Sequence, residues 1–185
     1  MQARSHQSLP DSPQRMILES KYGERDTFLI LFNPDVQYKI CDSDDRCFFG
    51  DFPTLATIKA GYGQNAPKMW LLPQLYNLSE YCGCHSKLQG KPLEECAHII
   101  AKEFWYLKIS EIMLFMYRFK AGCYGRFYGS VDPLIIIESL RKFCEERRYA
   151  YDRHEAQIRE QREKEECKNA ITYEEYLRRK EAGLI

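Results

Sequence analysis

Hydrophobic residues recur at three- and four-residue spacing through most of the chain after residue 52, a pattern typical of helices with one buried face. It predicts four helices, of which three begin at Pro53, at about residue 66 and near Pro92, and the fourth follows Ser110 as its N-cap. The second spans residues 66–81 and contains Pro73, which should kink or split it. Asp132 and Pro133 give the clearest start signal in the chain, because Asp caps a helix and Pro fits its first position.

The pattern in residues 26–49 is less decisive. The apolar run at 26–32 is too short for its period to distinguish a strand from a helix. Two further short stretches, 36–41 and 47–49, flank an acidic turn at 42–45. This arrangement is typical of a small β-hairpin, and it is the only β structure that the sequence suggests.

The helix predicted from Pro133 continues far past Arg148, because neither Pro nor Gly occurs again before Gly183. Beyond Tyr151 the apolar stripe is lost, and acidic and basic residues of nearly equal number can pair four positions apart. A break is expected at residues 169–172. Residues 172–175 then resemble a capping box that starts a short last helix.

Together these elements predict a mainly α-helical fold: a helical bundle with a small N-terminal piece compatible with β structure and a long charged C-terminal helix. We expect a disordered leader at residues 1–15, a single helical domain at 16–150 with its core in 50–150, and a charged helical extension at 151–185. The polar N-terminus has no secretory h-region, and no apolar run approaches the ~18 residues of a membrane span. With eight Cys and no signal peptide, a reducing, cytoplasmic location without membrane contact is expected.

Cysteine and histidine cluster at residues 82–85 (Cys-Gly-Cys-His) and again at Cys96 and His98. Thiolate and imidazole are the ligands that zinc prefers, but this spacing differs from that of a standard zinc finger. Cys96 and His98 would also face about 200° apart on a helix. We therefore predict neither a metal site nor a catalytic residue. The weak metal candidates are Cys82, Cys84, His85 and Cys96.

A binding surface is predicted around a glycine- and aromatic-rich stretch at residues 118–130. Between residues 108 and 128, four basic residues are opposed only by Glu111, and aromatic residues lie between them. Basic groups can neutralise phosphates and aromatic rings can stack on bases. The alternative is that the rings belong to the core and the basic residues to an ordinary surface. The candidate binding residues are Arg118, Lys120, Tyr124, Arg126 and Tyr128.

A resemblance to known sequences is carried by six segments: Phe52–Ile58, Tyr62–Gly63, Trp70–Leu71, Leu78–Tyr81, Tyr106–Phe115 and, above all, Arg118–Pro133. Over about residues 50–148 the chain resembles an uncharacterised family of proteins found in Bacteroidetes genomes and their mobile elements. That family has no established activity, so no functional residue is transferred. Its association with mobile elements implies a role in DNA replication or in maintenance of the element.

The formal net charge of zero argues against a dedicated nucleic-acid binder, which usually carries a basic excess. We predict a non-enzymatic binding or accessory protein, tied to DNA replication or to a mobile element, whose partner is another protein or DNA. The first alternative is a protein–protein interaction module without nucleic-acid contact. A thiol- or zinc-dependent enzyme is the less favoured alternative. No cofactor and no small-molecule substrate is predicted.

Overall fold

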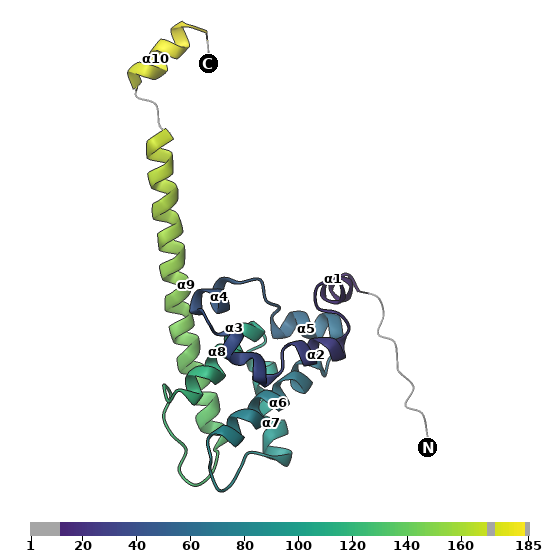
Figure 1. The fold of residues 1–185 in the computed structure, drawn as a ribbon. Coiled ribbons are helices and arrows are strands. Elements are labelled where there is room, and N and C mark those ends of the chain that lie inside the picture. The colour runs from purple at the N-terminus through teal and green to yellow at the C-terminus, as the bar shows by residue number, and fades with distance from the viewer. Residues whose placement is uncertain (1–11, 170–172, 184–185) are drawn as a thin grey trace. The chain divides into compact units, whose positions relative to one another are not determined.

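The computed structural model describes residues 12–169 and 173–183, and within them every regular element is a helix (Figure 1). The first half contains α1 (Pro13–Tyr22), α2 (Arg25–Leu31), the 3-10 helix η1 (Pro34–Val36), α3 (Gln37–Ile40), α4 (Asp44–Phe49) and α5 (Leu55–Tyr62). The second half contains α6 (Ala66–Tyr81), α7 (Gly90–Glu103), α8 (Ile109–Lys120), α9 (Pro133–Asn169) and α10 (Tyr173–Glu181). The predicted mainly α-helical fold is confirmed.

The β-hairpin predicted within residues 36–49 is wrong, because this stretch forms α3 and α4. The acidic turn is in fact a helix start. The Ser43 hydroxyl accepts a hydrogen bond from the Arg46 backbone N–H at 3.4 Å, and Asp44 and Asp45 occupy the first turn. Side-chain acceptors and negative charges both favour a helix N-terminus.

Helix α1 begins inside the stretch that was expected to be a leader. Ser12 caps it by accepting a hydrogen bond from the Arg15 backbone N–H at 3.1 Å, and Pro13 fits the first helical position. The remainder of the predicted leader, residues 1–11, lies outside the described residues. Thr172 of the predicted capping box also lies outside them, and the short last helix is α10.

Helix α8 is the central element of the core. Eight consecutive residues, Ile109–Met116, are buried, as expected for a helix that neighbours surround. Helices α3, α4 and α6 pack against it, and α6 also packs against α5 and α7. Helix α6 continues through Pro73 as one helix, and its Trp70 is fully buried.

The chain divides into two compact units, residues up to Cys144 and residues from Glu145 onward, and α9 contributes to both. In the first unit Ile136, Leu140 and Phe143 of α9 are buried. In the second unit none of the described residues is buried. No helix in the described ranges combines the length and the apolar character that crossing a membrane requires.

Candidate binding surface

The five predicted binding residues lie on the last turn of α8 and in the loop that follows it. Arg118 contributes to the folded structure, because its guanidinium donates to the Asp44 carboxylate at 2.5 Å. The guanidinium carbon also stands 5.9 Å from the ring centroids of both Phe48 and Phe143. Arg118 therefore ties α8 to α4 and to the start of α9, and its charge is already paired.

Lys120 differs from Arg118 because its partners are amide groups and an aromatic ring instead of a carboxylate. Its ammonium donates to the Gln37 side-chain oxygen at 2.7 Å and to that of Asn77, and it lies 5.7 Å from the centroid of the Tyr81 ring. No carboxylate lies within ion-pairing distance of it in the described residues. Burial lowers the pKa of Lys120 from its ordinary 10.5, opposed by nearby groups that include Asp35. The half-buried ammonium is thus bound by two amide oxygens and not by a carboxylate of the described residues.

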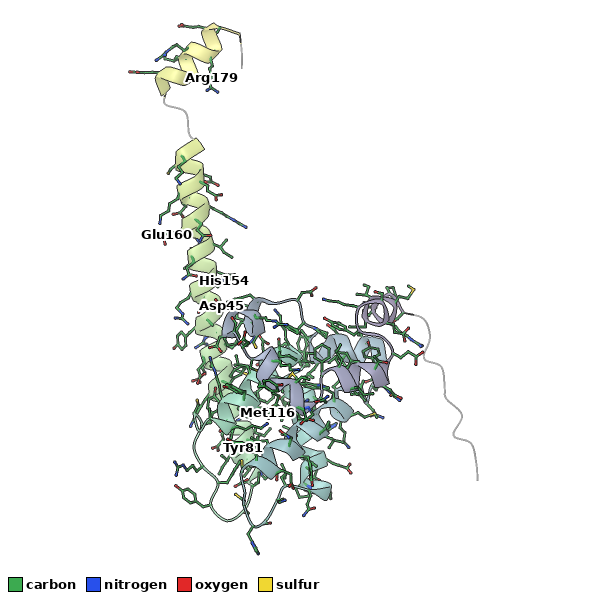
Figure 2. All side chains as sticks on the ribbon, in the orientation of Figure 1. Asp45, Tyr81, Met116, His154, Glu160 and Arg179 are labelled. Carbon is green, nitrogen blue, oxygen red and sulfur yellow. The ribbon has the colours of Figure 1, made fainter. Side chains whose placement is uncertain are left out.

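Exposed tyrosines surround this lysine. Tyr38, Tyr81 and Tyr117 lie next to Lys120, and we call these four residues the tyrosine surface. Tyr81, which is labelled in Figure 2, ends α6 and is 65% exposed.

Two hollows of about 330 Å³ each meet at Tyr81, Lys120 and Ala121. One extends toward η1 and α3, and Tyr38 and Tyr117 line it. The other extends under the loop and is lined by Arg126, Phe127 and the end of α8. The surface therefore offers two recesses on either side of one cation.

The loop after α8 is partly packed and partly exposed. The Tyr124 ring contacts Phe115 at a centroid distance of 5.4 Å, and Phe127 stacks on Phe119 at 5.2 Å. Arg126 is exposed, and Tyr128 is 89% exposed. The two predicted loop tyrosines thus differ, since one packs on the core and the other stands in solvent.

The loop is also fixed at its far end. The Ser86 N–H donates to the Gly129 carbonyl at 3.1 Å, and the Val131 N–H donates to the Ser86 carbonyl at 3.0 Å. Gly125 and Gly129 adopt positive φ, which residues with a side chain rarely do. These bonds join the α8–α9 loop to the α6–α7 loop and hold Arg126 beside the second hollow.

Most of the local basic excess predicted from the sequence is used inside the fold. The Lys108 ammonium donates to the carbonyls of Phe48 and Gly50 at 2.7 and 3.0 Å. With Arg118 on Asp44 and Lys120 on two amides, Arg126 alone of the four makes no such bond among the described residues.

The cysteine and histidine residues considered for zinc do not form a cluster. In the described part of the chain, no group of three or more His, Cys, Asp or Glu side chains is placed to hold a metal ion. Cys82 and Cys84 are half-buried after α6, and burial raises the pKa of Cys82. Cys96 is buried in α7, where burial raises its pKa to about 12. A high pKa favours the thiol over the thiolate that binds metals.

Sequence reasoning missed the polar residues that hold Lys120 in place. The buried Gln37 amide donates to the Gln74 side-chain oxygen at 2.7 Å, and the Gln74 amide donates to the Phe32 carbonyl at 2.8 Å. The Trp70 indole donates to the same carbonyl at 2.9 Å. The sequence did contain a sign of this network: Gln74 follows Trp70 by four residues, so a polar side chain lies on the apolar face of the helix and needs a buried partner.

The fold and this surface define a mainly α-helical protein with a tyrosine-lined recess around a half-buried lysine. The chain belongs to a family of unknown function, DUF6633, whose model matches residues 89–183. The match begins just before α7 and covers Lys120, Arg126 and α10. Comparison with curated proteins gave no match, and comparison with solved structures gave none either.

Proposed function

We propose that this protein is a non-enzymatic binding or accessory protein whose partner is another protein, held at the tyrosine surface. The observation that carries the proposal is Lys120, a half-buried ammonium without a carboxylate partner in the described residues, where two hollows meet. Two of its three donors are occupied, so one remains for a partner.

Tyrosine suits such a role, because its ring offers a rigid apolar face and its hydroxyl a polar end. Tyrosine and arginine are enriched among the residues that contribute most binding energy in protein interfaces. The partner that fits best presents an acidic side chain to Lys120 and apolar side chains to the two hollows. Burial of the ammonium, which costs free energy in the unbound protein, would then be offset by an ion pair.

A DNA partner, including a role in maintenance of a mobile element, is the alternative. Exposed Arg126 and Tyr128 support it, because a cation beside a free aromatic ring can hold single-stranded nucleic acid. Duplex binding draws on several phosphate contacts, whereas Lys108 and Arg118 are engaged inside the fold. The geometry therefore favours a protein partner.

The decisive experiment is affinity capture from host extract with matched variants. Lys120→Met and Tyr81→Ala remove the cation and one ring, and Tyr149→Ala removes an exposed tyrosine of α9 as the control. A protein retained by the wild type and by Tyr149→Ala, and lost from the other two variants, is the expected result. Retention by all four chains contradicts the proposal.

A parallel titration tests DNA. Fluorescence anisotropy with labelled single- and double-stranded DNA, at low and at physiological salt, reports direct binding. Salt-sensitive binding that Arg126→Ala abolishes would favour the DNA alternative.

A further inference from the structure

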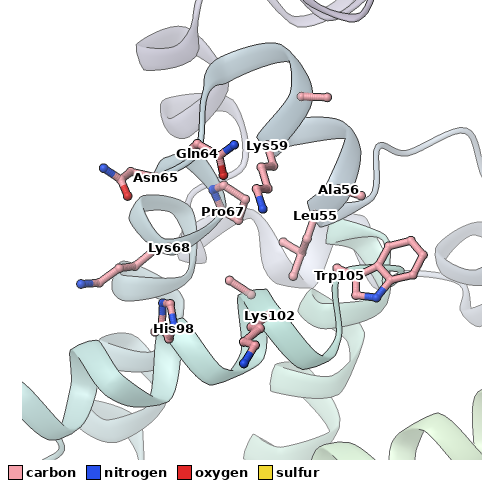
Figure 3. Close-up of a pocket in the computed structure, with 12 residues that line it drawn as sticks. Leu55, Ala56, Lys59, Gln64, Asn65, Pro67, Lys68, His98, Lys102 and Trp105 are labelled. Carbon is pink, nitrogen blue, oxygen red and sulfur yellow. The ribbon is translucent and has the colours of Figure 1, made fainter.

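A separate hollow of about 870 Å³ lies between α5, the start of α6, and α7 (Figure 3). Its volume falls within the range of pockets that hold small organic ligands. Its apolar lining consists of small or compact side chains, which are Leu55, Ala56, Ala60, Pro67 and Ala101. Trp105 forms one edge and is 56% exposed.

Backbone hydrogen bonds fix the wall that carries Trp105. The first N–H groups of α5 are capped by the α7–α8 connection. Ala56 donates to the Trp105 carbonyl at 2.9 Å, and Leu55 donates to the Leu107 carbonyl at 3.0 Å. The Trp105 ring also makes an edge contact with Tyr106 at a centroid distance of 5.9 Å. The hollow is therefore formed before any ligand arrives, which lowers the entropic cost of binding.

The charged residues of the lining are all lysines. Lys59, Lys68 and Lys102 line the hollow together with His98, and no Asp or Glu does. Lys59 makes no ion pair with any described residue, and Figure 3 shows its amine directed from α5 toward α7. Lys68 pairs with Glu94 at 2.8 Å, outside the lining. Surface pairs of this kind are worth little, so Lys68 can exchange partners.

The start of α6 also lies at the hollow, next to the basic residues of the lining. Asn65, its N-cap residue, makes no side-chain capping bond, and the first turn contains Lys68 but no acidic residue. A helix N-terminus carries a partial positive charge, but here the Ala66 N–H is bonded to the Gly63 carbonyl at 3.0 Å and Pro67 has no N–H. The lysines therefore supply most of the attraction for an anion.

Lys102 also has a carboxylate nearby, that of Glu103 at 4.0 Å. The hollow thus combines an apolar, aromatic-edged interior with a basic rim in which Lys59 is the lysine without an ion pair among the described residues.

We infer that this hollow binds a small organic anion with a planar apolar body. Trp105 and the apolar lining contact the body, and Lys59, assisted by Lys68, holds the anionic group. This site is independent of the tyrosine surface and does not rest on the function proposed there.

Anilinonaphthalene sulfonate is a suitable probe, because it joins a planar apolar body to one anionic group. Phenylnaphthylamine, which lacks the sulfonate, is its matched neutral control. The chain has two tryptophans, of which Trp70 is fully buried and Trp105 lines the hollow. Saturable binding is followed by the emission of the probe itself, and Trp105→Ala, which removes the aromatic edge, should weaken the binding of both probes.

The variant Lys59→Gln should weaken sulfonate binding at least about tenfold, as expected for loss of a charge-assisted contact. Binding of the neutral analogue should change little. Lys142→Gln, which removes an exposed lysine of α9 outside the hollow, should leave both unchanged. Unfolding curves establish that each variant is folded. The inference is overturned by non-saturable binding, by equal affinity for the two probes, or by a Lys59→Gln variant that binds as the wild type does.

Discussion

Lys120 should make the stability of the fold depend on pH in a predictable direction. Burial lowers its pKa below 10.5 in the folded chain. Between the folded and unfolded pKa values the unfolded chain holds a proton that the folded chain has released, so the free energy of unfolding rises with pH. The free energy of unfolding of the wild type minus that of Lys120→Gln should stay constant near neutral pH and rise as the pH approaches 10.5. Urea unfolding of both chains measures this, and a flat or falling difference would contradict it.

The cysteines should react in the order of their exposure. Cys123 and Cys167 are exposed, whereas Cys96 is buried and has its pKa raised to about 12. Because the thiolate is the reactive species, iodoacetamide at neutral pH should modify Cys123 and Cys167 first and Cys96 only after unfolding. A mass-spectrometric time course tests this. Faster modification of half-buried Cys82 or Cys84 would instead indicate an activated thiol and revive the enzyme alternative.

Helix α5 depends on the residue that precedes it, Thr54. Thr54 accepts a hydrogen bond from the Thr57 backbone N–H at 3.1 Å and so caps the helix. Thr54→Ala should lower the free energy of unfolding by about 1 kcal/mol, and Thr54→Ser, which keeps the hydroxyl, should lower it much less. Denaturant unfolding of the three chains provides the measurement. Equal losses in both variants would show that the methyl group matters rather than the cap.

The elements that the sequence predicted well are long, and only α9 also begins at its predicted cap; α8 begins at Ile109, one residue before Ser110, so Ser110 lies inside the helix and does not cap it. Helices α6 to α9 repeat their apolar positions over several turns, and α9 begins at the predicted Asp132 and Pro133. The wrong hairpin lay in α3 and α4, which are only four and six residues long, so neither could show a helical period. Ser43 was the missed signal, because a serine before two acidic residues also starts helices.

Of the predicted binding residues only Lys120 belongs to the tyrosine surface, because Tyr38 and Tyr81 reach it from α3 and α6, far away in the sequence. Arg118 and Lys120 stood out as basic residues among aromatic ones, but their partners lie far away in the sequence. Asp44 is 74 positions from Arg118, and Gln37 is 83 positions from Lys120. A periodic pattern reports only which face of an element is buried. It cannot report which distant side chain meets that face, and this decides whether a charge is free or paired.

For the whole molecule, burial indicates how much of α9 the fold requires. Its buried positions end at Phe143, and no described residue beyond Cys144 is buried. A chain that ends at Ala150 should therefore unfold at the same denaturant concentration as the full chain, with less helical signal in circular dichroism. A chain that ends at Asp132 also lacks Ile136 and Phe143 and should not fold.

The same truncation separates two ways of holding a partner. The tyrosine surface lies wholly in the first unit, so the chain that ends at Ala150 should still capture a protein that depends on Lys120 and Tyr81. Capture lost on truncation, with the unfolding midpoint unchanged, would mean that the charged second unit contributes to binding through its own acidic and basic side chains. Capture kept on truncation but lost in Lys120→Met would assign partner recognition to the recess around that lysine.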